Sequence, residues 1–307
     1  MRTTFIKTLH EAATEDDRIW LLCGDLGYSV LEQFRDSFPN RYVNVGVAEQ
    51  NMVGLAAGLA MCGKIVYVYS IANFPVMRCL EQIRNDVCYH NLNVRVVAVG
   101  GGLAYGSQGY THHGVEDIAV MRVMPHMTVL APADPYETRV LTQASIHHPG
   151  PCYIRLGKAN EPSIHTAAPS FEIGDVVYLR HGKDVSIIAI GSVLQIAVEA
   201  AARLEQQGIQ ASVLSMPTVW PCNDDAILRE ASTTHRVMTI EEHGYGGLGS
   251  IVSECIAQSN MPCQFHAVRL QNIPLSISGS HTFLKQQSLL SVESALAGAM
   301  QLLAKSI

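Results

Sequence analysis

Residues 44–60 read NVGVAEQNMVGLAAGLA, a run of small and apolar residues with a single ionisable group, Glu49. Glycine and alanine let helices and loops pack backbone to backbone, so the sequence predicts a buried segment with a helix from Ala48 onward. Burying a carboxylate is costly unless another group compensates its charge. The first question that this sequence poses is therefore the role of Glu49.

Strand-like apolar runs alternate with helix-like segments on both sides of this stretch. The predicted strands of the first half span residues 20–26, 42–47, 64–70, 93–101 and 126–132, and further predicted helices span 31–38, 77–89, 116–124 and 134–148. Continuous β-branched runs between helices are typical of a parallel sheet that is covered on both faces. The first half is therefore expected to be an α/β domain.

The second half repeats this pattern after a change in composition. Residues 158–175 contain prolines and little periodicity, which indicates a linker. Beyond it, predicted strands span 185–191, 210–217, 237–242 and 263–270, and predicted helices span 194–208 and 250–259. We expect two α/β domains, each a mostly parallel sheet covered by helices, at residues 1–160 and 179–307, joined by a linker at 161–178.

Composition excludes several classes of protein. The 307 residues are 48% hydrophobic and only 16% charged, which favours large contacts with other chains. A net charge of −6 argues against a nucleic-acid binder. No apolar run reaches the roughly 18 residues of a membrane span, and the N-terminus does not resemble a signal peptide. Eight cysteines without a CxxC pair indicate reduced thiols, so we expect a cytoplasmic protein.

Five segments, in order along the chain, resemble the transketolase family of thiamine-diphosphate enzymes. They are VGVAEQNMVGLAAGLA (45–60), LEQIRNDV (80–87), GYTHHGVEDIAVMRVMPHMTVLAPADP (109–135), YIRLGK (153–158) and EEHGYGGLGS (241–250). The resemblance covers nearly the whole chain. It implies a pyrimidine-binding fold for the first domain and the transketolase C-terminal α/β fold for the second.

Glu49 has two interpretations. From its position alone it is a carboxylate at a helix N-terminus, stabilised by the helix dipole. In the family that the chain resembles, the glutamate of the AEQ motif hydrogen-bonds the aminopyrimidine ring of the cofactor. A carboxyl group that shares a proton with this ring at neutral pH needs a raised pKa, which an apolar setting supplies. The resemblance thus implies that Glu49 activates thiamine diphosphate.

Asp25 and one of two aromatic residues, Phe74 or Tyr69, are the further candidates for cofactor-binding positions of the family. Asp25 matches an aspartate that faces the cofactor across the subunit boundary, although by itself it reads as a turn residue. Phe74 is the nearest aromatic in the loop that stacks on the pyrimidine ring, and Tyr69 is the alternative; otherwise both are core aromatics. Arg78, in the same region, is expected on a solvated helix face.

Three residues match substrate-binding positions. His112 occupies the G-x-T-H position that lies over the substrate, where a histidine donates to a developing oxyanion or moves a proton. Gln108 replaces an aspartate that contacts a substrate hydroxyl. Lys158 replaces an arginine that holds the sugar phosphate, and lysine binds phosphate as a point charge. Without the resemblance, Lys158 is a surface residue, and His112 and His113 lack a third ligand for zinc.

One pattern points elsewhere. GYGGLG (244–249) fits the G-x-G-x-x-G pattern of dinucleotide sites. However, it does not directly follow its strand, and it does not open a βαβ unit with a ribose-binding acid. We therefore expect it to serve packing and subunit contacts, as the resemblance implies.

The sequence lacks the GDG motif and downstream asparagine with which transketolases hold magnesium and the diphosphate. The chain therefore resembles only the latter half of the enzyme, a beta-like subunit of a split transketolase. An alpha-like partner would supply the diphosphate-binding domain and most ligands of Mg²⁺, which requires hard oxygen ligands. No metal ligand is expected in this chain, and the expected assembly is α2β2.

The implied activity belongs to carbohydrate metabolism. We expect a transferase that moves a two-carbon ketol unit between sugars, with Lys158 favouring phosphorylated ones. Its rivals are the beta subunit of a 2-oxo acid dehydrogenase and a deoxyxylulose-phosphate synthase-like enzyme that uses pyruvate. A non-catalytic regulatory relative is the alternative from another class. It predicts loss of the key acid, whereas Glu49 is present.

Overall fold

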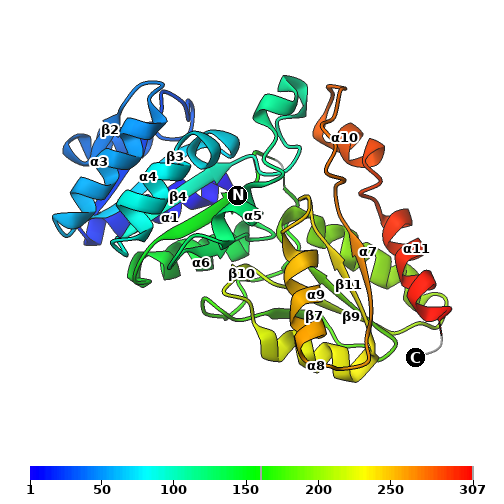
Figure 1. Cartoon of the computed structure of the whole chain (residues 1–307). Coiled ribbons are helices and arrows are strands. Elements are labelled where there is room, and N and C mark those ends of the chain that lie inside the picture. The colour runs from blue at the N-terminus through cyan, green and yellow to red at the C-terminus, as the bar shows by residue number, and fades with distance from the viewer. Residues whose placement is uncertain (160, 306–307) are drawn as a thin grey trace.

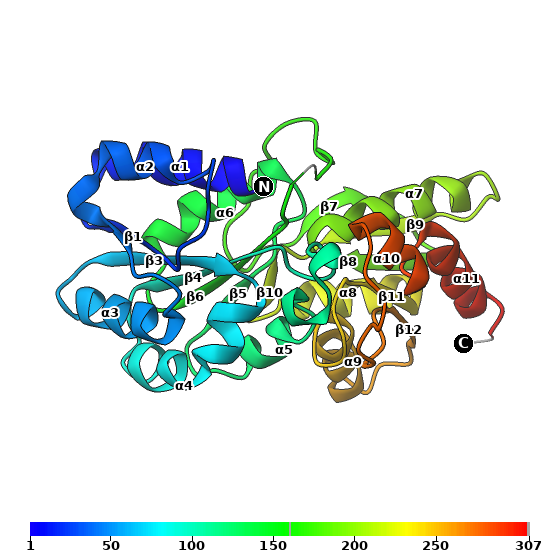
Figure 2. The same cartoon turned by 90° about the horizontal axis from the view of Figure 1, so that it is seen from above.

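The computed structural model describes residues 1–159 and 161–305. Two α/β domains lie side by side, each with a sheet between layers of helices (Figures 1 and 2). This confirms the predicted fold class. No helix in the described part of the chain is long and apolar enough to span a membrane.

The sheet of the first domain has seven strands in the order β10-β5-β6-β4-β3-β1-β2. They are β1 (Ile19–Cys23), β2 (Tyr42–Asn44), β3 (Ile65–Ile71), β4 (Val94–Val99), β5 (Thr128–Leu130), β6 (Cys152–Leu156) and β10 (Thr218–Trp220). All neighbours pair in parallel except β10, which is antiparallel to β5. The central strands β3 and β4 are almost completely buried, as expected for a parallel sheet covered on both faces.

Helices cover both faces of this sheet (Figure 2). One face carries α1 (Arg2–Glu15), α2 (Glu32–Ser37) and α6 (Pro135–His147), and the other carries α3 (Glu49–Met61), η2 (Phe74–Arg78), α4 (Leu80–Gln82), η3 (Ile83–Cys88) and α5 (Asp117–Arg122). The short turns are η1 (Pro39–Arg41), η4 (Gly106–Gln108) and η5 (Tyr110–His112). The helix predicted over residues 77–89 is present over Leu80–Cys88 but is interrupted at Cys79, and η2 and η3 are wider π-type segments. Such segments often accompany functional sites.

The second sheet has five strands in the order β12-β11-β8-β9-β7. They are β7 (Val177–Arg180), β8 (Val185–Ala189), β9 (Ala211–Ser215), β11 (Arg236–Ile240) and β12 (Gln264–Val268). Only β7 is antiparallel to its neighbour. The helical elements of this half are η6 (Gly191–Val193), α7 (Leu194–Glu205), α8 (Asp224–Thr234), α9 (Leu248–Gln258), α10 (His281–Gln287) and α11 (Val292–Leu303).

The predicted domain limits lie close to the ends of observed elements. β7 begins at Val177, inside the segment predicted as the linker. Asn160, at the predicted end of the first domain, and residues 306–307, at the end of the second, lie outside the described residues. The limits at 160 and 179 therefore stay a prediction.

The two domains share structure. β10 belongs to the second half of the chain but extends the first sheet, with Thr218 opposite Leu130. One apolar cluster also runs through both domains, and includes Met121 and Val129 of the first and Met216 of the second. Because burial of apolar surface is the main stabilising term, this continuous core fixes how the domains meet.

Candidate active site

Glu49 is the first residue of α3, and only 4% of it is exposed. Its carboxylate therefore lies at the positive end of a helix dipole. Gly24 packs against it from the end of β1, where a Cβ would be 3.6 Å from Glu49 Cγ. The acid thus lies at the carboxyl edge of the parallel sheet, which is where α/β proteins bind ligands.

Arg78 compensates the charge of Glu49. Its Nη1 donates to both carboxylate oxygens of Glu49 at 3.0 Å. Its guanidinium also lies over the ring of Phe74, 4.2 Å from the centroid, in a cation–π contact. Arg78 is exposed, as expected for a solvated helix face, but the wide η2 segment also brings its guanidinium against Glu49 of α3, which sequence reasoning did not anticipate. Its side chain is 48% exposed, so solvent screens the pair.

A cavity of about 610 Å³ opens beside this pair, which is a usual size for a small-molecule site. Its lining residues are Asn73, Phe74, Met77, Arg78, Tyr110, Thr111, His112, His113 and Glu116. Asn73 Nδ2 donates to the carbonyl of Thr111 at 3.0 Å, which ties η2 to η5. The structure thus brings together Phe74 and His112, whose rings meet edge to face at 5.1 Å between centroids.

The surroundings of His112 favour the neutral form of its imidazole. Burial, with a smaller contribution from the charge of Arg78, lowers its pKa below the ordinary value. Its Nδ1 lies 3.0 Å from Thr111 Oγ1. A neutral imidazole has one donor and one acceptor, so His112 can polarise a substrate oxygen or transfer a proton.

The other predicted cofactor residues lie in different surroundings. Asp25 is exposed next to Gly24, and its carboxylate accepts from Asn44 Nδ2 at 3.0 Å and from Tyr28 Oη at 3.1 Å. Tyr69 is buried in the core, where its ring stacks on Phe5 at 6.2 Å between centroids. Of the two aromatics considered for stacking, Phe74 lines the cavity and Tyr69 does not.

The two remaining predicted substrate residues, Gln108 and Lys158, lie outside the lining of this cavity. Gln108 is exposed in η4. Lys158 is half-buried, with Nζ 4.4 Å from the centroid of Tyr105. The ring of Tyr105 in turn lies 6.2 Å from that of His112. Tyr105 therefore links Lys158 to the histidine, although neither Lys158 nor Gln108 lines the cavity itself.

Arg155, three residues before Lys158, belongs to a buried network of hydrogen bonds. Its Nε donates to Asp117 at 2.7 Å, and its Nη2 donates to the carbonyls of Gly114 at 2.7 Å and Glu242 at 3.0 Å. Although burial acts in the opposite direction, the charges of Arg155 and His243 hold the pKa of Asp117 below its ordinary value. Sequence reasoning missed this network, which joins the two domains behind the loop that carries His112.

The GYGGLG segment has a structural role. Glu241 accepts the backbone N–H groups of Leu248 at 2.6 Å and Gly249 at 2.8 Å, at the start of α9. Burial raises the pKa of Glu241 to about 7. A Cβ on Gly247 would be 2.1 Å from Glu241 Oε2, so only glycine fits there. Because this carboxylate fills the anion position of the helix N-terminus, no dinucleotide phosphate can bind at it.

A magnesium site was expected on a partner. Among residues 1–159 and 161–305, no group of three or more His, Cys, Asp or Glu side chains is arranged to hold a metal ion.

Known families share this architecture. Residues 1–163 match the transketolase pyrimidine binding domain, and residues 174–293 match the transketolase C-terminal domain. The chain is 39% identical over 275 residues to one of the subunits of the apulose-4-phosphate transketolase of Phocaeicola vulgatus, covering 89% of this chain and 88% of the relative. It is 39% identical over 274 residues to the 6-deoxy-6-sulfo-D-fructose transketolase subunit SqwH of a Clostridium species, covering 89% and 85%.

A solved structure and a longer relative complete the comparison. A split gene transketolase, described as an inactive beta4 tetramer, superimposes with a TM-score of 0.89 at 36% identity, covering 98% of this chain and 97% of its own. The 1-deoxy-D-xylulose-5-phosphate synthase of Heliobacterium modesticaldum is 35% identical over 276 residues, which is 42% of that protein. The fold is thus that of the pyrimidine binding domain and the C-terminal domain of transketolases. The chain belongs to the transketolase family and corresponds to the beta-type half of its split members, as its motifs predicted.

Proposed function

We propose that this chain is the beta-like subunit of a thiamine-diphosphate-dependent transketolase that moves a two-carbon ketol unit between sugars. The observation that carries the proposal is the buried Glu49 at the carboxyl edge of the sheet, beside a cavity lined by Phe74 and His112. It is further supported by relatives that are named as transketolase subunits.

The residues around Glu49 suit an aminopyrimidine ring. A buried carboxyl group can hold a ring nitrogen through a shared proton, and Phe74 offers an aromatic contact beside it. Thiamine diphosphate, when bound, supplies the nucleophilic carbon that breaks and forms carbon–carbon bonds next to a carbonyl. Arg78 now contacts both oxygens of Glu49, so it has to release at least one of them for the ring to bind.

His112 and Lys158 would act on the substrate. A neutral His112 donates a hydrogen bond to the substrate oxygen on which negative charge develops, or takes the proton of a hydroxyl. Lys158 offers a positive charge next to Tyr105, and such a charge suits the phosphate group of a phosphorylated sugar. Gln108 reads a substrate hydroxyl through its amide, and Asp25 faces the cofactor from the subunit boundary.

Activity would require an alpha-like partner that binds the diphosphate and Mg²⁺. The related beta-only assembly is described as inactive, which supports this requirement. Tyr28 and Val47 are exposed by 71% and 75% near Glu49, and apolar groups exposed to this extent fit a protein interface. We propose an α2β2 assembly in the cytoplasm, acting in carbohydrate metabolism. The eight free cysteines agree with a reducing compartment.

Reconstitution tests this function. The chain would be mixed with an alpha-like subunit carrying the GDG motif, titrated with thiamine diphosphate and Mg²⁺, and assayed for ketol transfer between phosphorylated sugars. We expect turnover only when both subunits are present. Efficient transfer by this chain alone would refute the need for a partner.

A deoxyxylulose-phosphate synthase-like reaction is the second candidate, because a synthase of this type matches most of the chain. Pyruvate as the donor distinguishes the two. Release of CO₂ from pyruvate at a rate comparable with ketol transfer would favour the synthase, whereas we expect ketol donors to be preferred. If the two subunits form a complex that has no activity, the alternative of a non-catalytic regulatory relative would be favoured.

A further inference from the structure

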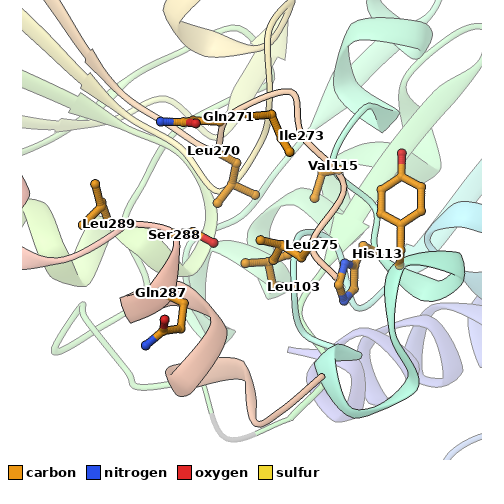
Figure 3. A pocket seen from close by; sticks show the side chains of 11 residues that line it. Leu103, His113, Val115, Leu270, Gln271, Ile273, Leu275, Gln287, Ser288 and Leu289 are labelled. Atoms are coloured by element: carbon orange, nitrogen blue, oxygen red, sulfur yellow. The ribbon is translucent and has the colours of Figure 1, made fainter. Parts of the chain in front are cut away.

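A second cavity, of about 200 Å³, lies between the two domains (Figure 3). It is lined by Leu103, Tyr110, His113, Val115, Leu270, Gln271, Ile273, Leu275, Gln287, Ser288 and Leu289. It shares only Tyr110 and His113 with the cavity beside Glu49, and none of Glu49, Phe74, Arg78 and His112 lines it.

His113 is a buried polar side chain directed at this cavity. It is 1% exposed, and neither ring nitrogen has a hydrogen-bond partner in the described part of the chain. Burial lowers its pKa, although the charge of Glu242 acts in the opposite direction. The ring is therefore neutral and offers one donor and one acceptor. Buried polar groups are normally hydrogen-bonded to protein or to a bound molecule, so His113 leaves one donor and one acceptor on the cavity wall that a bound molecule can satisfy.

Ser288 presents a second unsatisfied group from the other domain. Its Oγ is buried and has no hydrogen-bond partner among the described residues. In the view of Figure 3, the side chains of Leu103 and Leu275 lie between those of His113 and Ser288. The cavity thus has a polar group on each domain and an apolar wall between them.

We propose that this cavity binds a neutral small molecule with a hydroxyl group at each end and an apolar body. None of the lining residues is an Asp, Glu, Lys or Arg, so a sugar phosphate would find no opposite charge here. A cavity of about 150 Å³ holds benzene, so this one suits a ligand of about nine non-hydrogen atoms. The ligand would contact both domains, and it would touch His113, the residue that follows His112 in the chain.

A matched pair of probes tests the proposal. 4-Hydroxybenzyl alcohol has about nine non-hydrogen atoms and a hydroxyl at each end, and 4-ethyltoluene has the same shape without hydroxyls. Binding of each to the full-length chain would be measured by ligand-observed NMR. We expect His113→Leu and Ser288→Ala each to weaken binding of the alcohol about fivefold relative to the hydrocarbon, the typical effect of one hydrogen bond.

Two further variants keep the test decisive. His112→Leu, which changes the neighbouring histidine outside this cavity, should leave the ratio of the two affinities unchanged. Leu275→Phe, at a partly exposed position, should fill the cavity and weaken both probes about tenfold, which provides a test even where His113→Leu does not fold. No binding of the alcohol to the unmodified chain would overturn the proposal. The proposal would also be overturned if His113→Leu, Ser288→Ala and Leu275→Phe all bound the alcohol with the affinity of the unmodified chain.

Discussion

One nitrogen of Arg78, Nη1, lies 3.0 Å from both carboxylate oxygens of Glu49. The acid is almost completely buried and the arginine is half exposed, so a solvent-exposed cation stabilises a buried carboxylate. This contact joins the start of α3 to η2, the segment that also carries Phe74. It also explains how a carboxylate is tolerated in the apolar stretch that contains it.

Glu49→Gln in the reconstituted complex should lower turnover at least a hundredfold, within the range of about 10²–10⁴ for a lost acid–base group. Glutamine keeps the shape of the side chain but cannot share a proton with the cofactor ring. Steady-state kinetics would measure this, with the thermal unfolding midpoint as a check of the fold. Glu81→Gln, an exposed acid on α4, is the control. Near-normal turnover in Glu49→Gln would show that Glu49 does not activate the cofactor.

Arg78→Met should tighten binding of thiamine diphosphate to the complex about two- to fivefold, because an exposed ion pair worth up to about 1 kcal/mol no longer competes for Glu49. Titration of the cofactor while following activity would measure the apparent Kd. Arg84→Met, whose exposed arginine contacts Asn85, should leave the Kd unchanged. Weaker cofactor binding in Arg78→Met would show that the arginine supports the cofactor instead of competing with it.

Lys158→Met should raise KM for a phosphorylated sugar about tenfold, with kcat little changed, because a charge that binds the phosphate equally in ground and transition states is lost. KM for the unphosphorylated sugar should not change. Lys183→Met, an exposed lysine of the second domain, is the matched control. Equal effects on both sugars would mean that Lys158 does not contact the phosphate.

Glu241→Gln should change how stability depends on pH. Burial raises the pKa of Glu241 from 4.5 to about 7, so the native state binds more protons than the unfolded state between these values. Ionising Glu241 therefore lowers the free energy of unfolding as pH rises through this range. The variant should gain about 3 kcal/mol relative to the unmodified chain from about pH 4.5 to pH 7, with no further gain above.

Urea denaturation at several pH values measures this difference. His243 Nδ1 lies 3.9 Å from Glu241 Oε2, so the comparison uses pH values above about 5, where His243, whose pKa burial lowers to about 4, is neutral. Glu199→Gln, at an exposed acid of α7, should show no pH-dependent gain. A stability difference for Glu241→Gln that is independent of pH would contradict the prediction.

Arg155→Met should destabilise the chain by about 3–5 kcal/mol, because it leaves the buried Asp117 carboxylate without its counter-charge. Arg122→Met, which removes an arginine paired with the largely exposed Glu254, should cost about 1 kcal/mol or less in ion-pair energy. Denaturant unfolding would compare the two. The double variant Asp117→Asn, Arg155→Met should be more stable than Arg155→Met alone, and failure of that rescue would mean that lost packing dominates.

Much of the fold is readable from the sequence, because β-branched runs such as β3 and β4 and the alternation with helices are local patterns. The antiparallel edge strands β7 and β10 were missed. β10 pairs with β5 from another part of the chain, and a short edge strand carries little local pattern. The wide turns of η2 and η3 were also missed, because their sequence reads as an ordinary helix.

The sequence by itself indicated the family and two candidate site residues, Glu49 and His112, because each lies in a short motif whose chemistry depends on residue type. It left Phe74 and Tyr69 as alternatives for the stacking aromatic. Only the tertiary structure decided what surrounds these residues. It pairs Arg78 with Glu49 and Arg155 with Asp117. It also places Tyr69 in the core and brings His113 and Ser288 to the same cavity. These outcomes depend on contacts between residues far apart in the chain, and such contacts follow from how the two sheets and their helices pack.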